Sequence, residues 1–298
     1  MHILLTGASG LIGRAVTAWL TNRGHSVVPL RRGSVTNPAN PSWNPQTGEI
    51  RLVSAVPFEA VIHLAGETIV QRWTPAAKER IRASRVEATR LLCGALAQLP
   101  QPPQVLVCAS ATGFYGERGD AILDEQSAPG AGFLPTVCQA WEAAAAPAIE
   151  RNIRVVHLRL GLVLTRHGGA LAKMLPAFRL GLGGRIGSGR QSWSWIEIED
   201  LLRLIEWALT RQALCGGVNA VSPDAVTNAD FTRTLALALG RPAFLPVPAA
   251  AVNLVFGEMG RDVLLASARV RPARLLADGF EFRFPQLESA LNHALLST

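Results

Sequence analysis

A glycine-rich turn at the amino terminus constrains the fold of this chain more than any other feature. Residues 6–13 read TGASGLIG, with an apolar run directly before them and a helical pattern directly after them. A turn of this kind between a strand and a helix is typical of the first unit of a dinucleotide-binding sheet. Gly7 would permit the tight turn, Gly10 the approach of a pyrophosphate, and Gly13 close packing of helix on strand. We expect the dinucleotide to contact Gly7, Ser9, Gly10, Leu11, Ile12 and Gly13.

The same alternation of strand and helix continues along the first half of the chain. Buried strands are predicted at residues 2–6, 26–30, 61–65, 105–109 and 154–160. Helical patterns lie between them at residues 11–22, 75–99 and 134–150. Such alternation indicates βαβ units and a parallel sheet. We therefore predict an α/β fold, with a doubly wound parallel Rossmann sheet over residues 1–165, a return segment near 190–222, and a smaller C-terminal substrate-binding lobe over most of 166–298.

Composition excludes several classes of protein. The chain has 298 residues, 49% of them hydrophobic and 17% charged, which is enough apolar material for a globular core and excludes disorder. Its longest apolar stretches, at 153–164 and 247–255, are interrupted before the roughly 20 residues that a membrane span needs. No secretory signal pattern begins the chain, so we expect a cytoplasmic protein. The four cysteines form no CxxC pair and have no histidines at zinc-ligand spacing, which predicts neither a metal site nor a disulfide framework.

The chain is basic, with a net charge of +7, but its charges are scattered. Apart from Lys78 and Lys173, every basic residue is an arginine. A nucleic-acid surface would gather these charges in a stripe with aromatic residues between them, and no such stripe is present. We expect a small-molecule substrate as partner, and neither a nucleic acid nor a membrane; the patterns specify no oligomeric state.

Two arginines directly follow the second predicted strand, at the position where dinucleotide-binding sheets select their cofactor. A protein selective for NAD usually has an acidic residue there to bind the adenosine ribose. This chain has Arg31 and Arg32. A guanidinium can pair bidentately with the ribose 2′-phosphate of NADP, whereas a carboxylate would repel it. We therefore predict NADP(H) as cofactor, the alternative being that both arginines are ordinary solvated side chains.

Four further segments identify a family resemblance. They are HLAG at residues 63–66, SRVEAT at 84–89, SATGFYG at 110–116 and WIEIEDL at 195–201. With the glycine turn, they resemble the motifs of the extended short-chain dehydrogenase/reductases (SDRs), which include NAD-dependent nucleotide-sugar epimerases and dehydratases. The pairs RW at 72–73 and WE at 141–142, with GSGRQ at 187–191 and GFEFRFP at 279–285, resemble an atypical SDR group called epimerase family proteins. The resemblance implies that Leu64, Ala65 and Gly66 lie beside the cofactor.

The chain departs from this family in its catalytic dyad. Ordinary members use a tyrosine and, four residues later on a helix, a lysine that lowers the tyrosine pKa. Tyr115 is the only tyrosine here, and Gly119 stands four residues after it. Aligning the helix by its usual start puts Cys138 in the tyrosine position and Glu142 in the lysine position, one turn apart on one face. A carboxylate raises the pKa of a nearby thiol, so Cys138 is a poor substitute for the tyrosine.

Other residues must therefore carry any proton transfer. By the resemblance, Ser110 is the surviving catalytic serine, with Thr112 as the alternative, and Arg85 replaces the asparagine of the family's NVxGT motif. Glu67, directly after a strand, would serve as a general base if it were buried. We predict proton transfer through Ser110 with either Glu142 or Glu67, and not through Tyr115. The predicted catalytic set is Ser110, Glu142, Glu67, Cys138 and Arg85.

Two segments are candidates for substrate binding. Lys78, Arg82 and Arg85 lie on one face of a predicted helix and would hold an anionic substrate or neutralise acidic neighbours, unless that face is merely solvated. Arg190, Gln191 and Trp193 follow a glycine-rich loop, a composition typical of a pocket rim, although tryptophans are as often core residues. Trp193 also stands where sugar-nucleotide enzymes have a diphosphate-binding arginine, which weakens the case for a sugar-nucleotide substrate.

Two functional classes remain open from the sequence. One is an NADP-dependent oxidoreductase or epimerase-like isomerase acting on a small polar substrate. The other is a noncatalytic NADP(H)-binding or redox-sensing protein that acts through a partner. The missing dyad favours the second class, and the retained Ser110 favours the first.

Overall fold

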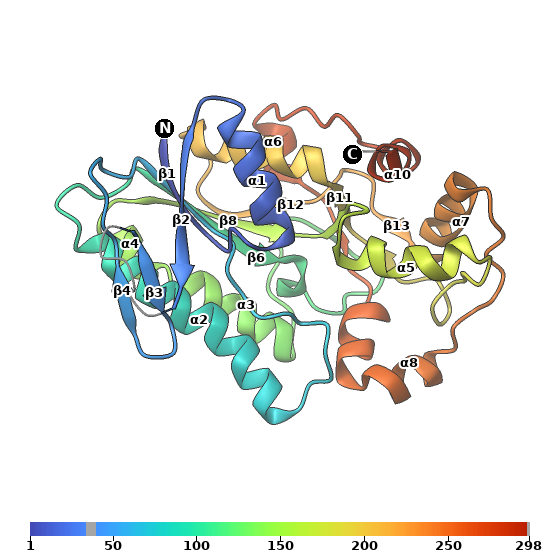
Figure 1. The fold of residues 1–298 in the computed structure, drawn as a ribbon. Coiled ribbons are helices and arrows are strands. Elements are labelled where there is room, and N and C mark those ends of the chain that lie inside the picture. The colour runs from blue at the N-terminus through green and yellow to red at the C-terminus, as the bar shows by residue number, and fades with distance from the viewer. Residues whose placement is uncertain (34–39, 297–298) are drawn as a thin grey trace.

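The predicted parallel sheet is present and is larger than the sequence patterns indicated. The computed structural model describes residues 1–33 and 40–296. Eight strands form one sheet in the order β12-β8-β6-β5-β1-β2-β3-β4 (Figure 1). Their bounds are β1 His2–Thr6, β2 Ser26–Arg32, β3 Ser42–Asn44, β4 Glu49–Arg51, β5 Ala60–His63, β6 Val105–Ala111, β8 Arg154–Leu160 and β12 Gly216–Ala220. Every neighbouring pair is parallel except β3 with β4, so the α/β fold class is confirmed.

The order of the strands places a crevice at one edge of the sheet. From β1 the chain builds outward through β2, β3 and β4, and then returns to the other side of β1 for β5, β6, β8 and β12. The order therefore reverses between β1 and β5, whose last residues, Thr6 and His63, are register partners. Ligands of open α/β sheets bind at such a reversal, beyond the carboxyl ends of the strands.

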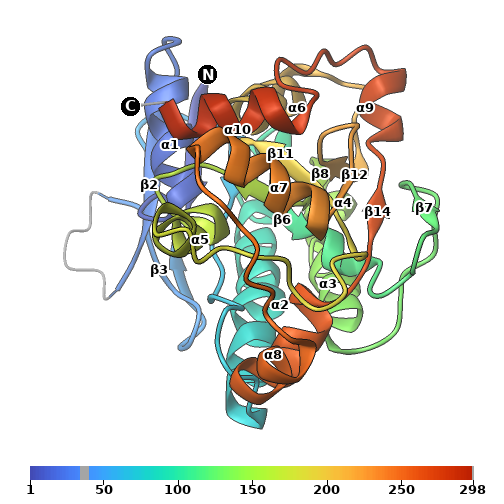
Figure 2. The same cartoon turned by 90° about the vertical axis from the view of Figure 1, so that its right-hand side faces the viewer.

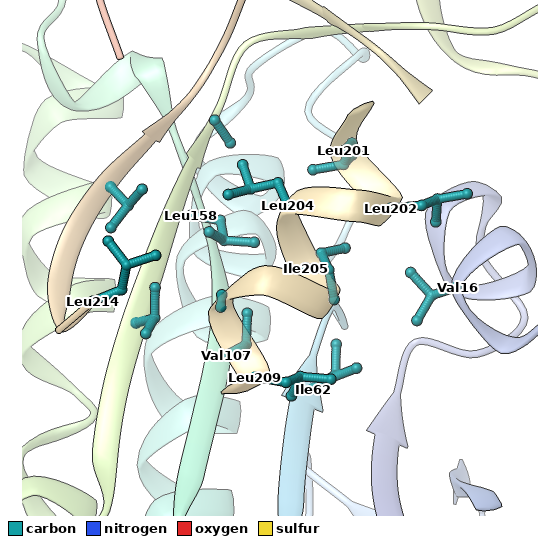
Figure 3. Close-up of a cluster of buried hydrophobic side chains, with 14 of the residues drawn as sticks. Val16, Ile62, Val107, Leu158, Leu201, Leu202, Leu204, Ile205, Leu209 and Leu214 are labelled. Atoms are coloured by element: carbon teal, nitrogen blue, oxygen red, sulfur yellow. The ribbon is translucent and has the colours of Figure 1, made fainter. Parts of the chain in front are cut away.

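Helices cover both faces of the sheet, with α1 and α6 on one face and α2, α3 and α4 on the other (Figure 1). The helices are α1 Leu11–Thr21, α2 Pro75–Ala97, α3 Phe133–Ala143, α4 Ala146–Glu150, α5 Gly169–Arg179, α6 Ile198–Thr210, α7 Asn228–Leu239, α8 Ala249–Phe256, α9 Ala273–Ala277 and α10 Leu287–Leu296, with short turns η1 Thr112–Phe114 and η2 Gly260–Leu264. Leu201, Leu204 and Ile205 recur at helical spacing on α6. They face strand residues such as Leu158 in the buried cluster of Figure 3.

The part of the chain that follows β8 forms its own small core and returns to the sheet. Leu171 of α5, Phe231 of α7 and Leu291 of α10 pack around Trp195. Short strand pairs connect this part: β9 Leu162–Leu164 with β11 Trp195–Glu197, β10 Ser192–Trp193 with β13 Val226–Thr227, and β7 Ile122–Leu123 with β14 Arg269–Val270. None of the described helices is long and apolar enough to cross a membrane.

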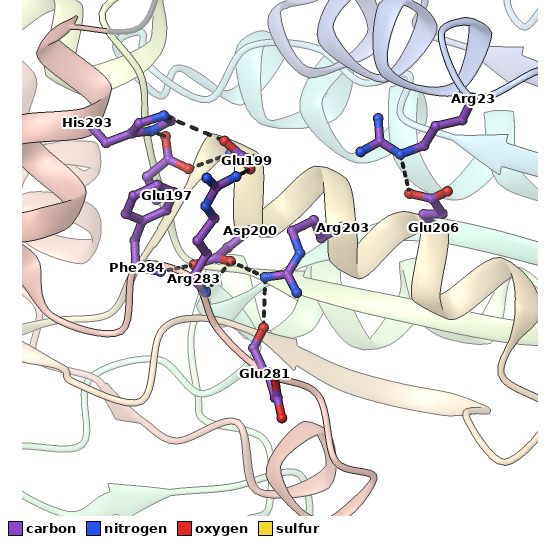
Figure 4. A network of polar contacts seen from close by, with 10 residues as sticks. All are labelled: Arg23, Glu197, Glu199, Asp200, Arg203, Glu206, Glu281, Arg283, Phe284 and His293. Atoms are coloured by element: carbon purple, nitrogen blue, oxygen red, sulfur yellow. Dashed lines mark hydrogen bonds and ion pairs between the residues drawn. The ribbon is translucent and has the colours of Figure 1, made fainter.

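Two contacts hold the carboxy-terminal segments in place. Asp200, fully buried on α6, accepts hydrogen bonds at 2.8 Å from the backbone N–H groups of Arg283 and Phe284, just before α10 (Figure 4). Met259, between α8 and η2, packs against Ile81 near the start of α2; Figure 2 shows α8 beside α2.

Three local features differ from the predicted elements. The single helix expected at 134–150 is two helices, because Pro147 cannot continue a helix interior but fits the first turn of α4. The hairpin of β3 and β4 was not predicted, since each strand has only 3 residues. Strand β12 was also missed, because its two glycines, Gly216 and Gly217, are residues that strands usually lack.

Candidate functional site

The glycine turn has the geometry that its sequence predicted, and the reason for each glycine can be assigned. Gly7 has φ +73°, and a Cβ there would lie 2.8 Å from the carbonyl carbon of Leu64. A Cβ on Gly13 would lie 2.1 Å from the carbonyl oxygen of Gly7. Packing therefore requires both glycines. Gly10 is exposed, and its Cβ would meet only the oxygen of Gly7 at 3.2 Å, so packing requires glycine less strictly there.

The first turn of α1 offers a binding site for an anion. Gly10 is its N-cap, no side chain caps the turn, and no acidic residue lies in it. Free backbone N–H groups and the positive end of the helix dipole therefore face the crevice. Ser9 is exposed beside them, whereas the side chain of Leu11 packs against Gly168 and that of Ile12 against the core. These residues fit a dinucleotide pyrophosphate, with Leu11 and Ile12 contributing backbone only.

Residues 64–66 lie directly against the glycine turn. The N–H groups of Leu64 and Ala65 each donate to Thr6 Oγ1 at 3.2 Å, so the end of β1 fixes this segment. Arg31 and Arg32 are exposed at the end of β2, the neighbour of β1. No described carboxylate lies within ion-pair distance of either arginine. Both guanidinium groups can therefore donate hydrogen bonds to a phosphate at this edge of the sheet.

A buried polar cluster lies at the carboxyl ends of β6 and β8. The Ser110 hydroxyl, on β6, donates to Glu142 Oε1 of α3 at 2.7 Å. Arg159 of β8 holds the same carboxylate with two parallel bonds of 2.9 Å, Nε to Oε1 and Nη2 to Oε2. Its guanidinium also lies 3.5 Å from the centre of the Phe114 ring. Only 7% of the Arg159 side chain and 14% of the Glu142 side chain are exposed, so this is a strong, geometrically fixed ion pair.

The other side of Arg159 binds the only tyrosine. Arg159 Nη1 donates to Tyr115 Oη at 3.0 Å, and that hydroxyl donates to Asn219 Oδ1 at 2.7 Å. Tyr115 is fully buried, and burial raises its pKa despite the opposing charge of Arg159. The phenol therefore stays protonated, as expected from the sequence, but its pKa is raised rather than ordinary.

Sequence reasoning missed Arg159 and Asn219. A signal for Arg159 existed, because an arginine within the buried run VVHLRL needs a buried partner. Asn219 lies on β12, a strand that was not predicted. The two are register partners on neighbouring strands, and both bind the Tyr115 hydroxyl. A Cβ on Gly217 would lie 2.8 Å from Arg159 Cζ, so glycine leaves the space that the guanidinium occupies.

The structure separates the alternatives among the hydroxyl and thiol groups. Thr112 donates to the carbonyl of Leu160 at 3.3 Å, so Ser110 is the hydroxyl bound to the carboxylate. Cys138 is 3% exposed. Burial first, and the charge of Glu142 second, raise its thiol pKa to about 12. Cys138 therefore remains a protonated thiol at neutral pH, and the structure does not support a catalytic role for it.

Other predicted residues have structural partners instead. Glu67 does not meet the condition of burial, since 35% of its side chain is exposed, and it lies 3.9 Å from Arg80. Lys78 pairs with Glu258 at 2.6 Å, and Arg82 is exposed beside acidic neighbours, so these two do not form a shared anion site with Arg85. The described residues contain no cluster of three or more potential metal ligands.

The predicted pocket rim is part of the carboxy-terminal core. Gln191 is buried and donates to the carbonyl oxygens of Ile186 and Leu264. Trp193 lies edge to face with Phe231 at 5.4 Å. Arg190 is exposed; its backbone N–H donates to Ser188 Oγ at 3.2 Å, and its guanidinium has no partner among the described residues. The tryptophan and glutamine therefore stabilise the lobe, in agreement with the core alternative.

A second buried network connects the glycine turn to α3. Thr6 Oγ1 accepts two backbone N–H groups and so donates to His63 Nδ1 at 2.6 Å. The opposite ring nitrogen bonds Thr89 Oγ1 at 2.9 Å, which also accepts the Trp141 indole N–H at 2.9 Å. Burial, with a smaller effect of the Arg32 charge, lowers the pKa of His63 to about 4, so the ring is neutral.

Comparison with known proteins agrees with this geometry. Residues 3–219 match the NAD dependent epimerase/dehydratase family, and residues 247–294 match a family described as a domain of unknown function (DUF1731). Epimerase family protein Mb2239 of Mycobacterium bovis is 40% identical over 293 residues, covering 98% of this chain and 97% of its own length. The human epimerase family protein SDR39U1 is 40% identical over 296 residues, covering 98% of each chain.

A solved structure of human SDR39U1, isoform 2, with NADPH superimposes with a TM-score of 0.90 at 38% identity and full coverage of both chains. The match extends over the glycine turn, the Ser110 cluster and the carboxy-terminal segments together. The resemblance inferred from the motifs is confirmed: this chain belongs to the NAD-dependent epimerase/dehydratase family, among the SDR39U1-like epimerase family proteins.

Proposed function

We propose that the protein is an NADP(H)-dependent oxidoreductase that interconverts a hydroxyl and a carbonyl group on a small polar substrate. The observation that carries this proposal is the hydrogen-bonded set of Ser110, Glu142 and Arg159 at the carboxyl ends of the strands. Ser110 and Glu142 stand where the family resemblance places the catalytic serine and lysine, and Arg159 reaches the same carboxylate from β8.

The cofactor part of the proposal rests on the first two strands. The glycine turn, the uncapped start of α1 and the exposed Arg31 and Arg32 fit a dinucleotide that carries a ribose 2′-phosphate. The NADPH in the structure of the human relative supports this choice. When bound, NADP⁺ would accept the hydride that leaves the substrate carbon.

The proton would leave the substrate hydroxyl through Ser110. The serine proton is directed at Glu142 Oε1, so the Ser110 lone pairs can accept the hydrogen of a substrate hydroxyl. As that proton reaches Ser110, the serine proton passes to the Glu142 carboxylate. Reduction of a carbonyl would use the same path in reverse.

Arg159 is the positioning residue in this arrangement. Its two bonds fix the plane of the Glu142 carboxylate. Burial alone would lower the pKa of Arg159, but its hydrogen bonds and ion pair with Glu142 outweigh burial and raise it. The guanidinium therefore stays charged, and Tyr115, bound on its other side, anchors it rather than moving a proton.

The proposed function is tested by measuring catalytic turnover. Protein saturated with NADP⁺ or NADPH is offered a panel of hydroxy and carbonyl compounds, and the nicotinamide absorbance band is followed. With a substrate in hand, Glu142→Gln and Ser110→Ala should each lower kcat by about 10²- to 10⁴-fold, the usual contribution of a general acid or base. Glu150→Gln, an exposed carboxylate at the end of α4, is the matched control and should retain the wild-type kcat.

Two outcomes would contradict the proposal. If Tyr115→Phe loses that much activity while Glu142→Gln stays near wild type, the phenol carries the proton. If NADPH binds but no compound in the panel changes the nicotinamide band, the protein is a noncatalytic NADP(H)-binding or redox-sensing protein.

A further inference from the structure

Among the described residues, one cation at the crevice, Arg85, has no carboxylate within ion-pair distance. Arg85 lies on α2 with its guanidinium 5.1 Å from the centre of the Trp141 indole of α3. Its Nη1 donates to the carbonyl of Ile81 at 3.2 Å and lies 3.4 Å from Ser84 Oγ. These contacts fix one side of the guanidinium and leave Nη2 and Nε without a hydrogen-bond partner among the described residues.

Arg85 differs in this respect from every other cation on its helix. Each of the others lies within 4 Å of a carboxylate: Lys78 of Glu258, Arg80 of Glu67, Arg82 of Glu79 and Glu87, and Arg90 of Glu87. Arg85 has no such neighbour in the described part of the chain, although burial lowers its pKa and so disfavours its charge. A partly buried charge that the protein leaves unpaired costs stability. A ligand that supplies the anion would remove that cost.

The Nη2 side of Arg85 lies against the segment proposed to contact the cofactor. A Cβ on Gly66 would lie 3.5 Å from both Cζ and Nη2, and Gly66 belongs to the segment beside the glycine turn. On α3, Cys138 is within electrostatic reach of both Arg85 and Glu142. Arg85 of α2 and Glu142 of α3 therefore both lie near Cys138.

We propose that Arg85 binds a carboxylate of the substrate and that the substrate is a hydroxy- or oxo-carboxylate whose reacting carbon lies toward Ser110 and Glu142. This inference rests on the proposed function, since it names the substrate class of that site. A single guanidinium edge with two free N–H directions matches the two oxygens of a carboxylate. The charge of Glu67 already acts on Arg85, and that of Glu142 acts on the neighbouring Cys138, which favours a monoanion over a phosphate dianion.

Binding of matched charged and neutral probes tests the proposal. NADPH-saturated protein is titrated with glycolate, lactate and 3-hydroxybutyrate, and separately with the corresponding neutral amides, while NADPH fluorescence is recorded. At least one carboxylate should bind about tenfold to a hundredfold more tightly than its amide, the range for hydrogen bonds between charged groups. Arg85→Gln should abolish that preference, and Arg85→Lys should retain part of it. Arg90→Gln removes the same charge from an exposed position of the same helix and should change nothing.

NADPH affinity and the thermal unfolding midpoint of each variant establish that it is folded and loaded. The inference is overturned if wild-type protein prefers none of the carboxylates to its amide, or if the preference survives Arg85→Gln. A wild-type protein that binds no NADPH would instead refute the proposed function, so the two failures are distinguishable.

Discussion

The buried imidazole of His63 makes the stability of this fold depend on pH in a calculable way. Its ring bonds Thr6 at the end of β1 and Thr89 on α2, and its pKa is lowered from 6.5 to about 4. Between these values the unfolded chain binds a proton that the folded chain does not, so stability falls as the pH falls from about 6.5 to about 4. At 1.36 kcal/mol per pKa unit, the full loss is about 3 kcal/mol. Above pH 6.5 this histidine contributes no pH dependence.

The assay is urea unfolding followed by circular dichroism at intervals between pH 8 and pH 4, for wild type and His63→Gln. The variant is expected to be less stable at pH 7, because it loses the imidazole bonds, but its stability should fall less as the pH is lowered. The difference between the two curves isolates His63 from other titrating groups, and the interval above pH 6.5, where both curves should run parallel, is the internal control. Equal slopes for both proteins below pH 6.5 would refute the reasoning.

Three further predictions follow from the same contacts. Arg159→Met should lower the free energy of unfolding by about 3 to 5 kcal/mol in urea titrations, because it leaves a buried carboxylate unpaired; a loss under 1 kcal/mol would show that the pair is unimportant to the fold. Gly13→Ala should abolish NADPH binding and destabilise the protein, because its Cβ would lie 2.1 Å from a carbonyl oxygen, whereas Gly94→Ala, inside α2 with open space, should stabilise by about 0.5 to 1 kcal/mol. Thermal unfolding measures the effect of each glycine substitution on stability, and equal effects of the two would contradict the geometry. Iodoacetamide at pH 8 should modify the exposed Cys215 and leave Cys138 intact, as read by peptide mass spectrometry, because burial raises the pKa of Cys138 to about 12; rapid alkylation of Cys138 would disprove its burial.

Much of the fold could be predicted because buried parallel strands have short, continuous apolar sequences. Residues 2–6 and 105–109 are such runs, and both are strands of the sheet. The glycine turn could be predicted equally well, since Gly13 is required by packing within the turn and Gly7 has a positive φ, +73°, that favours glycine whatever its neighbours. Strand β12 could not be predicted, because its Gly217 is explained only by Arg159 on β8, a strand that is its neighbour in the sheet but lies far away in the sequence.

The candidate site was predictable where one helix or one strand end determines it. The family resemblance predicted Ser110 with either Glu142 or Glu67 as its acidic partner, and Glu142 is the one hydrogen bonded to it. Which basic residues of α2 have acidic partners could not be predicted in the same way. Lys78 is paired with Glu258, 180 residues further along the chain, and only tertiary packing brings the two together. That packing is also what leaves Arg85 as the unpaired member of the face.

The choice of cofactor is tested most directly by one titration. NADPH and NADH are each titrated into wild type and into the double variant Arg31→Ala with Arg32→Ala, with Arg51→Ala, an exposed arginine of β4, as control. If the two arginines hold the ribose 2′-phosphate, wild type and control will prefer NADPH, and the double variant will lose about tenfold to a hundredfold of that preference while its NADH affinity stays constant. An unchanged preference for NADPH in the double variant, or equal binding of both dinucleotides by wild type, would contradict the account.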